Sequence, residues 1–374
     1  MNSTGKVIIF LEGLLPVSET FVKAQGEMLR WDVLFAGLSP GQPTLRLDRP
    51  VVRLVASRSW LAEKRIGLYR RIRIAPSFHK RLATWGADLL HAHFAPNGLF
   101  AIPLAEMLSI PLLVTLHGYD VTADFALAND YRPLWERAQK FICVSEALKK
   151  KAIDAGFPED KLLVHYIGID TRLFPQRKPE EEDPNMVLFV GRLAEKKGVH
   201  HLMETMRRLR TKHPNARVVL AGDGALRANL EQTAREFNLN ATFLGMQSQE
   251  KVHDLLRTAA VLCAPSVTAA NGDSEGLPMT IIEAQSTGVP VVGYRHGGVP
   301  EGVIDGVSAL LAPEGDVDQL TGHLDNILSN RERRIQMGDA GARNVRSHFD
   351  LQAQTKLLER IYQDIVARAS GSAR

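Results

Sequence analysis

The sequence has few cysteines and no long apolar run, and both absences narrow the class of protein. Cys143 and Cys263 are the two cysteines among 374 residues, too few for a disulfide framework. Both lie in apolar, strand-like surroundings, so we expect buried free thiols in a reducing compartment. No segment approaches the ~18 apolar residues of a membrane span. The apolar run 7–11 is too short for a signal peptide and predicts a first strand, so we expect a cytoplasmic protein.

The overall composition is that of an ordinary globular protein. Hydrophobic residues make up 45% of the chain and charged residues 24%, which excludes collagen-like, low-complexity and wholly disordered classes. A length of 374 residues favours two domains at roughly 100–200 residues each. No short internal repeat is present.

Strand-like apolar runs alternate with helical patterns along the whole chain. This alternation predicts an α/β fold with parallel sheets, in which ligands bind beyond the carboxyl ends of the strands. The expected strands are 7–11, 33–36, 89–92, 112–115, 141–144, 163–167, 187–190, 217–220, 242–244, 261–264, 289–293 and 309–311. The expected helices include 202–213, 226–237, 249–259 and 281–286.

A proline-rich, charged segment without periodicity interrupts this alternation at residues 174–185 and predicts an interdomain linker. We therefore expect two Rossmann-like domains facing each other across a cleft. The first would span residues 1–173 and the second residues 186–350. A last helix in residues 351–374 would pack back toward the first domain.

The net charge of +4 is unevenly distributed. Residues 51–85 contain nine Lys and Arg side chains but one acid, Glu63, with apolar and aromatic residues between them. A basic amphipathic helix of this kind suits an anionic membrane surface or an anionic substrate, and the plainer alternative is a solvated helix face. Nucleic-acid binding is the least favoured reading, and we expect no nucleic-acid partner.

The strongest candidate site is a glycine-rich loop that leads into a helix at residues 271–284. Free backbone amides at the start of that helix make an anion site suited to phosphate. Glu275 precedes the helix and Glu283 lies about 8 Å further along its axis. Carboxylates accept hydrogen bonds from sugar hydroxyls, so the pattern suits a nucleotide sugar. The loop and helix start comprise Gly276, Leu277, Pro278, Met279 and Thr280.

Two further loops follow predicted strands. In the first, Gly191 precedes Arg192 and Lys197, whose cationic groups suit phosphate oxygens and can stabilise a phosphate leaving group. In the second, His117 is the best candidate for a polar group that faces the cleft. Asp120, in the same loop, either orients the loop or meets the acceptor.

These motifs resemble those of family 4 glycosyltransferases of the GT-B fold. The resemblance spans nearly the whole second half of the chain, at consistent order and spacing. It is carried by Glu275 and Glu283 with Gly276-Leu277-Pro278, Gly191-Arg192-Leu193 with Lys197-Gly198, Ala221-Gly222-Asp223-Gly224, Phe243-Leu244-Gly245 and Gly297-Gly298-Val299-Pro300-Glu301. The first half resembles bacterial exopolysaccharide and lipopolysaccharide members through Ser18-Glu19-Thr20-Phe21, His91-Ala92-His93-Phe94 and His117-Gly118-Tyr119-Asp120.

The resemblance implies retaining transfer of a hexose from a nucleotide diphosphate sugar, without a metal or other cofactor. His117 would contact the donor sugar, Arg192 and Lys197 the diphosphate, Glu275 the sugar hydroxyls and Glu283 the ribose. The nucleotide would also meet backbone near Gly222, Gly245 and Met246, and Ser145 near the cleft. The loop after the first strand has only Gly13 where similar enzymes often have paired glycines, so the resemblance leaves two roles open for it, donor binding and acceptor binding. The candidate acceptor residues are Ser18, Glu19, Thr20, His93 and Asp120.

The remaining expectations concern substrates and alternatives. UDP-sugar is the favoured donor, with GDP-mannose next, and the acceptor would be a lipid-linked or oligosaccharide glycan of a bacterial surface polysaccharide. The protein would then work at the inner face of the cell membrane. A nucleotide-sugar epimerase of the same fold and a non-catalytic sugar-nucleotide scaffold are the alternatives. The pair Asp316 and Asp318 lies at a predicted helix start, where acids cap the helix, so no metal site is expected.

Overall fold

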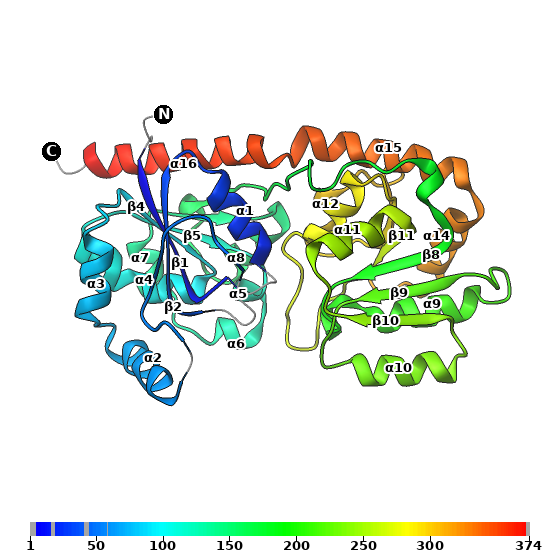
Figure 1. The fold of residues 1–374 in the computed structure, drawn as a ribbon, viewed down its shortest axis with the longest axis horizontal. Helices are drawn as coiled ribbons and strands as arrows, with labels where there is room; N and C mark the ends of the chain where they lie inside the picture. Colours follow the sequence, from blue (N-terminus) through cyan, green and yellow to red (C-terminus); the bar gives the residue numbers. More distant parts are fainter. Residues whose placement is uncertain (1–4, 16–18, 41–44, 58, 372–374) are drawn as a thin grey trace. The chain divides into compact units, whose positions relative to one another are not determined.

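The computed structural model describes residues 5–15, 19–40, 45–57 and 59–371, which form two compact units. Unit 1 contains residues up to 168 together with residues 351–371, and unit 2 contains residues 169–350 (Figure 1). Unit 1 is therefore discontinuous in sequence, because the chain leaves it at residue 168 and re-enters it at residue 351.

Unit 1 is built on a seven-stranded, all-parallel sheet with the order β3-β2-β1-β4-β5-β6-β7. The strands are β1 (Lys6–Leu14), β2 (Asp32–Pro40), β3 (Val51–Arg53), β4 (Leu89–His93), β5 (Leu112–Leu116), β6 (Lys140–Cys143) and β7 (Leu162–Val164). The helices are α1 (Thr20–Met28), α2 (Trp60–Ile72), α3 (Pro76–Ala83), α4 (Ala95–Leu108), α5 (Tyr119–Thr122), α6 (Asp124–Leu127), α7 (Arg132–Arg137), α8 (Glu146–Asp154), η2 (Glu159–Lys161) and α16 (Leu351–Gly371). Since all strands are parallel, the loops that follow them lie at one edge of the sheet.

The core of unit 1 is completed by α16. Val7, Ile9 and Phe35 of the central strands are fully buried, as expected for strands covered on both faces. From α16, Tyr362 packs edge-on against Trp31, with ring centroids 5.2 Å apart. Residues from the end of the sequence thus belong to the same hydrophobic core as the first strand.

Unit 2 contains a six-stranded, all-parallel sheet with the order β10-β9-β8-β11-β12-β13. The strands are β8 (Asp183–Val190), β9 (Arg217–Ala221), β10 (Ala241–Gly245), β11 (Ala259–Ala264), β12 (Val291–Tyr294) and β13 (Ala309–Ala312). The helices are η3 (Pro179–Glu181), η4 (Glu195–Lys197), α9 (Val199–Leu209), α10 (Arg227–Glu236), α11 (Gln249–Thr258), α12 (Met279–Ser286), α13 (Val299–Gly302), α14 (Val317–Ser329) and α15 (Arg331–His348).

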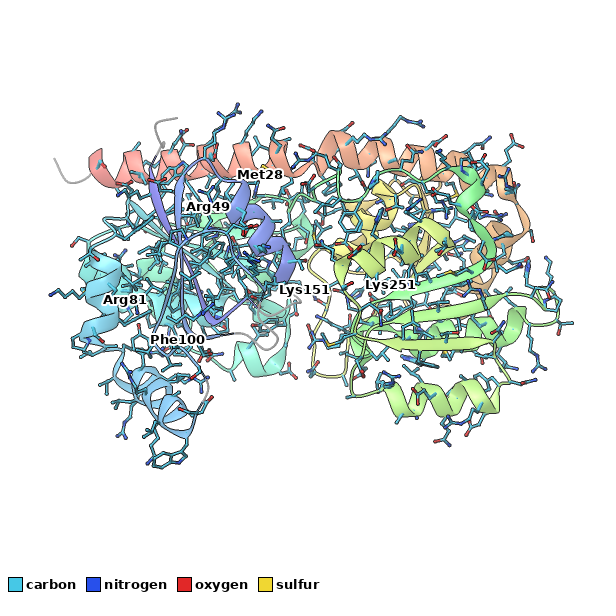
Figure 2. All side chains as sticks on the ribbon, viewed as in Figure 1. Met28, Arg49, Arg81, Phe100, Lys151 and Lys251 are labelled. Carbon is cyan, nitrogen blue, oxygen red and sulfur yellow. The ribbon has the colours of Figure 1, made fainter. Side chains whose placement is uncertain are left out.

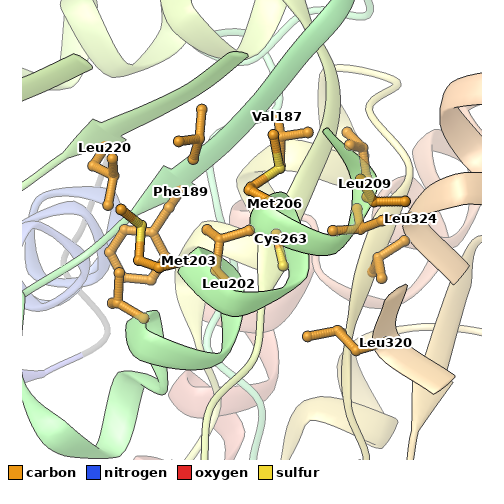
Figure 3. Close-up of a cluster of buried hydrophobic side chains, with 14 of the residues drawn as sticks. Val187, Phe189, Leu202, Met203, Met206, Leu209, Leu220, Cys263, Leu320 and Leu324 are labelled. Atoms are coloured by element: carbon orange, nitrogen blue, oxygen red, sulfur yellow. The ribbon is translucent and has the colours of Figure 1, made fainter. Parts of the chain in front are cut away.

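Helix α9 supplies much of the core of unit 2. Its residues Leu202, Met203 and Met206 recur at helical spacing and are buried against the sheet. Figure 3 shows these side chains packed with Phe189 of β8 and Cys263 of β11. The cluster fixes the carboxyl ends of the strands, from which the candidate site is built.

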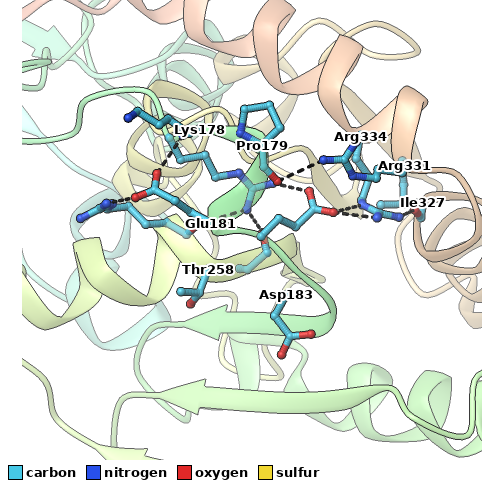
Figure 4. Close-up of polar contacts among 12 residues, drawn as sticks. Lys178, Pro179, Glu181, Asp183, Thr258, Ile327, Arg331 and Arg334 are labelled. Atoms are coloured by element: carbon cyan, nitrogen blue, oxygen red, sulfur yellow. Dashed lines mark hydrogen bonds and ion pairs between the residues drawn. The ribbon is translucent and has the colours of Figure 1, made fainter.

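The segment 174–185 is a packed part of unit 2 and contains η3 and the start of β8. Glu182 is buried between Arg177 and Arg334, at 2.8 Å and 2.6 Å. The Arg334 guanidinium also donates to the carbonyl of Ile327 at 2.7 Å, and Figure 4 shows this network. Two charged residues of the segment predicted to be an interdomain linker, Arg177 and Glu182, are therefore paired in the interior of unit 2.

The expectation of parallel α/β units is confirmed, whereas three local expectations were wrong. The short strand β3 was missed, and β1 extends to Leu14, so Gly13 lies in the strand rather than in a loop. Strand β7 ends at Val164, three residues earlier than expected. Cys143 and Cys263 are buried free thiols. Within the described ranges, none of the helices has the length and apolarity that crossing a membrane requires.

Candidate active site

Three loops of unit 2 interlock through glycines where β8, β9 and β10 end. The amide of Gly191 donates to Ala221 O at 3.0 Å, and the amide of Gly222 donates to Gly245 O at 2.8 Å. A Cβ atom on Gly222 would lie 1.8 Å from Gly191 O, so a side chain has no room there. Met246 follows directly and its side chain is 60% exposed. The loops that follow β8, β9 and β10 therefore meet through backbone atoms at the carboxyl edge of the sheet.

The short helix η4 and the glycine that follows it determine the position of Lys197. Gly198 has φ +58°, and a Cβ atom on it would lie 1.8 Å from Pro265 O. This close approach brings the loop after β8 against the loop after β11. As a result, Lys197 Nζ lies 2.6 Å from Oε1 of Glu275. Arg192 lies in the same loop and is exposed.

Glu275 is the centre of a buried hydrogen-bond network. Its Oε1 also accepts from the Ser266 hydroxyl at 3.1 Å. Its backbone amide donates to Nε2 of His296 at 3.2 Å, and Nδ1 of that ring lies 2.8 Å from Oε2 of Glu314. Since Nε2 accepts, the proton of the ring is on Nδ1 and points at Glu314. Backbone and side chain of Glu275 are thus both held in place.

The charges around Glu275 keep it ionised. Burial raises the pKa of Glu275, but Lys197 and Lys196 and the hydrogen bonds from Lys197 and Ser266 outweigh burial, so the pKa lies below its ordinary value. An ionised carboxylate accepts hydrogen bonds at two oxygens, and a Lys ammonium has three donors. The Glu275 carboxylate can therefore accept hydrogen bonds from hydroxyl groups. The Lys197 ammonium group can at the same time donate hydrogen bonds to an anion.

Helix α12 begins at Met279, with Pro278 as its N-cap residue and Leu277 buried before it. The first amides of a helix have no partner within the helix and favour an anion. Thr280 lies in this first turn. Glu283 lies one turn further along, partly buried, and burial raises its pKa to about 7. Gly276 is buried between Glu275 and the helix.

In unit 1, three histidines line up at the ends of β4 and β5. Nδ1 of His93 lies 3.0 Å from Nε2 of His117, and their rings stack. His91 contacts the Thr115 hydroxyl at 2.7 Å and the Tyr362 hydroxyl at 2.6 Å. Burial lowers the pKa of His93 to about 3, and burial together with His93 holds the pKa of His117 well below its usual range. All of these rings are therefore neutral at pH 7.

Asp120 orients the loop that carries His117. Its carboxylate is fully buried and accepts the backbone amides of His117, Gly118 and Ala95 at 2.8–3.2 Å. Burial raises its pKa to about 6, with the backbone hydrogen bonds acting in the opposite direction. Of the two roles considered for Asp120 in the sequence, the geometry supports orientation, since the carboxylate has no exposed surface to offer an acceptor.

The remaining residues of unit 1 that were predicted to bind donor or acceptor differ in burial and in hydrogen bonding. Glu19 precedes α1, and burial raises its pKa to about 7. Thr20 is the first residue of α1, whereas Ser18 lies outside the described residues. A Cβ atom on Gly13 would meet no atom within 4 Å. Ser145 is buried and caps α8, because its hydroxyl accepts the Leu148 amide at 3.1 Å.

Three residues of the Glu275 network were missed in the sequence: Ser266, His296 and Glu314. A signal for one of them was available, because His296 directly precedes the Gly297-Gly298 pair. Gly297 has φ +50°, and a Cβ atom on it would lie 2.3 Å from Glu275 O. That glycine therefore lets the His296 loop approach the backbone of Glu275. Asp316 caps α14 through the Gln319 amide, as expected.

Comparison with protein families and known sequences finds relatives along most of the chain. Residues 23–173 match the family described as Glycosyltransferase Family 4, and residues 170–344 match Glycosyl transferases group 1. WcaL of Escherichia coli, named for colanic acid biosynthesis, is 32% identical over 270 residues, or 70% of this chain. The amylovoran biosynthesis glycosyltransferase AmsK of Erwinia amylovora is 32% identical over 63% of this chain. The matches span 66% and 60% of the lengths of these two relatives.

Solved structures share the fold along nearly the whole chain. HepE from Anabaena, solved in complex with UDP and glucose, has a TM-score of 0.77 at 18% identity, covering 96% of this chain and 99% of its own. Sucrose-phosphate synthase from Thermosynechococcus elongatus has a TM-score of 0.75 at 21% identity, covering 97% and 100%. At these identities the likeness is one of fold.

Proposed function

Because the chain belongs to glycosyltransferase family 4 and has the GT-B fold, we propose that it transfers a hexose from a nucleotide diphosphate sugar to an acceptor hydroxyl. The observation that carries this proposal is the buried network of Lys197, Glu275 and His296 beside the start of α12. An ionised carboxylate, an ammonium group and free helix amides stand together there. Groups of these kinds can bind the hydroxyls and the phosphates of a sugar joined to a diphosphate.

Each group has a role in this proposal. Glu275 accepts hydrogen bonds from the sugar hydroxyls, while Lys197 and Arg192 with the first amides of α12 bind the diphosphate. Glu283 binds the ribose, and backbone near Gly245 contacts the base. In unit 1, neutral His117 donates to the sugar.

We propose that transfer retains the anomeric configuration and needs no metal. The bond between the sugar C1 and the phosphate oxygen breaks, and a bond from C1 to the acceptor oxygen forms on the same face. The departing phosphate oxygen takes the proton of the acceptor hydroxyl. Lys197, Arg192 and the helix amides stabilise the negative charge that develops on the diphosphate, which replaces the role of a metal ion.

We infer UDP-sugar as the donor class and a lipid-linked glycan as the acceptor. HepE, which shares the fold, was solved with UDP and glucose. WcaL and AmsK are named for the biosynthesis of extracellular polysaccharides, which supports a place in exopolysaccharide assembly. Such an acceptor places the enzyme at the inner face of the cell membrane.

Binding of the nucleotide is tested by thermal unfolding with UDP, GDP or dTDP in the absence of metal. A ligand at 100 times its Kd stabilises the protein by about 2.7 kcal/mol. We expect a clear upward shift in Tm with UDP, which Lys197→Ala removes. Lys251→Ala serves as the matched control, because Lys251 is an exposed lysine of the same unit.

Transfer is tested with UDP-hexoses and lipid-linked acceptors. We expect Glu275→Gln and Lys197→Ala to lose transfer while their circular dichroism remains that of the wild type. Full activity in both variants would overturn the proposal. An epimer of the donor, formed without acceptor, would favour the epimerase instead, and neither binding nor turnover with any donor would favour the scaffold.

A further inference from the structure

Unit 1 contains a pocket lined by arginines that the proposed reaction does not use. It has a volume of about 530 Å³ and lies between the end of β3, the start of α2 and α3. We call it the arginine pocket. It is lined by Val51, Arg53, Leu54, Val55, Ala56, Ser57, Ser59, Leu61, Ala62, Arg65 and Arg81. Three of these residues are arginines, and none of the described lining residues is acidic.

The arginine pocket has the features of a site for an anion. Nε of Arg53 is buried with no hydrogen-bond partner in the described part of the chain. Arg81, labelled on α3 in Figure 2, is held beside it by a hydrogen bond of 3.4 Å to the Arg53 carbonyl. Guanidinium groups bind phosphate oxygens with paired donors. An anion that enters the pocket would lie in a space lined by three cationic side chains, Arg53, Arg65 and Arg81.

The start of α2 adds to this charge. Ser59 is the N-cap residue and its hydroxyl accepts the Ala62 amide at 3.1 Å, and both residues line the pocket. The positive end of the helix dipole of this 13-residue helix therefore faces the same space.

The outer face of α2 is apolar and aromatic. Ala62, Ile66 and Tyr69 form the buried face of the helix. Five large apolar side chains of α2 and the residues after it are exposed, by 45–68%: Trp60, Leu61, Leu68, Ile72 and Ile74. Lys64 Nζ lies 3.7 Å from the centroid of the Trp60 ring. A helix that presents such residues among Lys and Arg has the composition of one that lies in a membrane interface.

Leu61 joins the two features, because it is both exposed and part of the pocket lining. One exposed apolar side chain, Leu61, thus lines the arginine pocket, and the exposed Trp60 precedes it in the sequence, whereas a site for a free phosphate ion gains nothing from either. The chemistry fits a phosphate that is attached to a hydrocarbon chain.

Helix α2 and the residue that follows it are also held to β1 and α4 of unit 1. Arg70 pairs with Glu12 in β1, and the guanidinium carbon of Arg73 lies 3.7 Å from the centroid of the Phe100 ring. Since β1 and β3 are parallel strands of one sheet, the pocket at the end of β3 lies at the carboxyl edge of that sheet. His93, at the end of β4, lies at the same edge.

We propose that the arginine pocket binds the phosphate group of an anionic membrane lipid while α2 lies on the bilayer surface, with Trp60 and Leu61 among the headgroups. This inference deepens the membrane location given under the proposed function, and its test is independent of glycosyl transfer. The three arginines supply the charge, and the exposed apolar side chains supply the contact with lipid.

The test measures binding of the full-length protein to vesicles without any sugar donor. We expect flotation with vesicles of phosphatidylcholine and phosphatidylglycerol, none with phosphatidylcholine alone, and weakening at high salt. A basic residue near an anionic surface contributes about fivefold to partitioning. The triple variant Arg53→Gln, Arg65→Gln and Arg81→Gln is therefore expected to bind about 100-fold more weakly.

Two further variants make the outcome specific. The control removes three exposed charges from unit 2, as Arg235→Gln, Lys251→Gln and Arg343→Gln, and is expected to bind like the wild type. Trp60→Ser with Leu61→Ser leaves the pocket charge intact and is expected to lose vesicle binding. Equal binding by the wild type and the arginine-pocket variant would overturn the proposal. So would thermal stabilisation by inorganic phosphate, lost in that variant, in a protein that binds no vesicles, since the site would then serve a soluble phosphate.

Discussion

The hydroxyl of Tyr362 lies 2.6 Å from Nδ1 of His91, although 271 residues separate them in the sequence. Both side chains are fully buried, and the other ring nitrogen of His91 contacts Thr115 at 2.7 Å. The contact fastens α16 to β4, the strand that ends at His93. The stability of unit 1 therefore depends on residues that follow unit 2 in the chain.

Tyr362→Phe is expected to destabilise unit 1 because it leaves a buried ring nitrogen without its partner. The cost is about 1–3 kcal/mol, measured by urea unfolding. Tyr294→Phe is the control, since the buried Tyr294 hydroxyl has no hydrogen-bond partner among the described residues. A Tyr362→Phe protein as stable as the wild type would contradict the importance of this contact.

Gly198→Ala is expected to abolish nucleotide binding. The added Cβ atom would collide with Pro265 O at 1.8 Å and would need φ near +58°, so η4 would shift and carry Lys197 away from Glu275. Gly322→Ala is the matched control, because Gly322 lies within α14 with open space around it. That variant should bind UDP normally and gain up to ~1 kcal/mol in stability. Normal UDP binding by Gly198→Ala would show that the loop tolerates the collision.

His296→Ala tests whether the positioning of Glu275 matters. The variant removes the acceptor of the Glu275 amide and the link to Glu314. We expect kcat to fall ~10–100-fold, as for the loss of a buried hydrogen-bonding group, while the far-UV circular dichroism is unchanged. His253→Ala in α11 serves as the control. A loss of folded protein in place of a loss of kcat would assign His296 a purely structural role.

Glu283 predicts a dependence of stability on pH. Burial raises its pKa from 4.5 to about 7, so between these values the folded state binds the proton that the unfolded state has lost. Its contribution to stability is therefore fully present below about pH 4.5 and is lost as the pH rises through 7.

Glu283→Gln should consequently gain stability relative to the wild type on going from pH 5 to pH 8, by ~1–3 kcal/mol. Urea unfolding at both pH values measures this. Glu19, whose pKa is also raised to about 7, contributes with the same sign in unit 1, so Glu19→Gln shows the effect of a similar group elsewhere. An identical pH dependence in wild type and Glu283→Gln would contradict the assignment.

Metal dependence is tested directly in the transfer assay. We expect millimolar EDTA to leave the rate unchanged, because Lys197, Arg192 and the helix amides supply the positive charge at the diphosphate. A loss of activity with EDTA that is restored by Mg²⁺ or Mn²⁺ would overturn the metal-free proposal.

The sequence predicted the elements that carry strong periodicity. The apolar runs of β4, β5, β8 and β11 and the helical spacing of α9 were recognised within a few residues, because burial on both faces leaves a continuous apolar signal. Strand β3 was missed because it has three residues and lies within the basic segment. The segment 174–185 was misread because pairing of Arg177, Glu182 and Arg334 is not visible in local composition.

In the candidate site, too, contacts between residues far apart in the sequence could not be predicted from local composition. Lys197 and Glu275 were identified because each lies in a recognisable loop motif. Ser266 and Glu314 were missed because each is a single polar residue near a strand end, and their roles arise only when the strands are placed side by side. The arginine pocket likewise combines β3, α2 and α3, of which the sequence indicated only the basic charge of the whole segment.

The discontinuity of unit 1 has a consequence for synthesis on the ribosome. Unit 2 is one continuous stretch, so it can fold as soon as residue 350 has emerged. Unit 1 has to wait for α16, which at 5–20 residues per second comes about 10–40 s after residue 168 is made. During that interval the face of unit 1 that later buries Tyr362 is uncovered. We therefore expect the nascent first unit to bind chaperones, and a chain that stops before α16 to be sensitive to proteolysis.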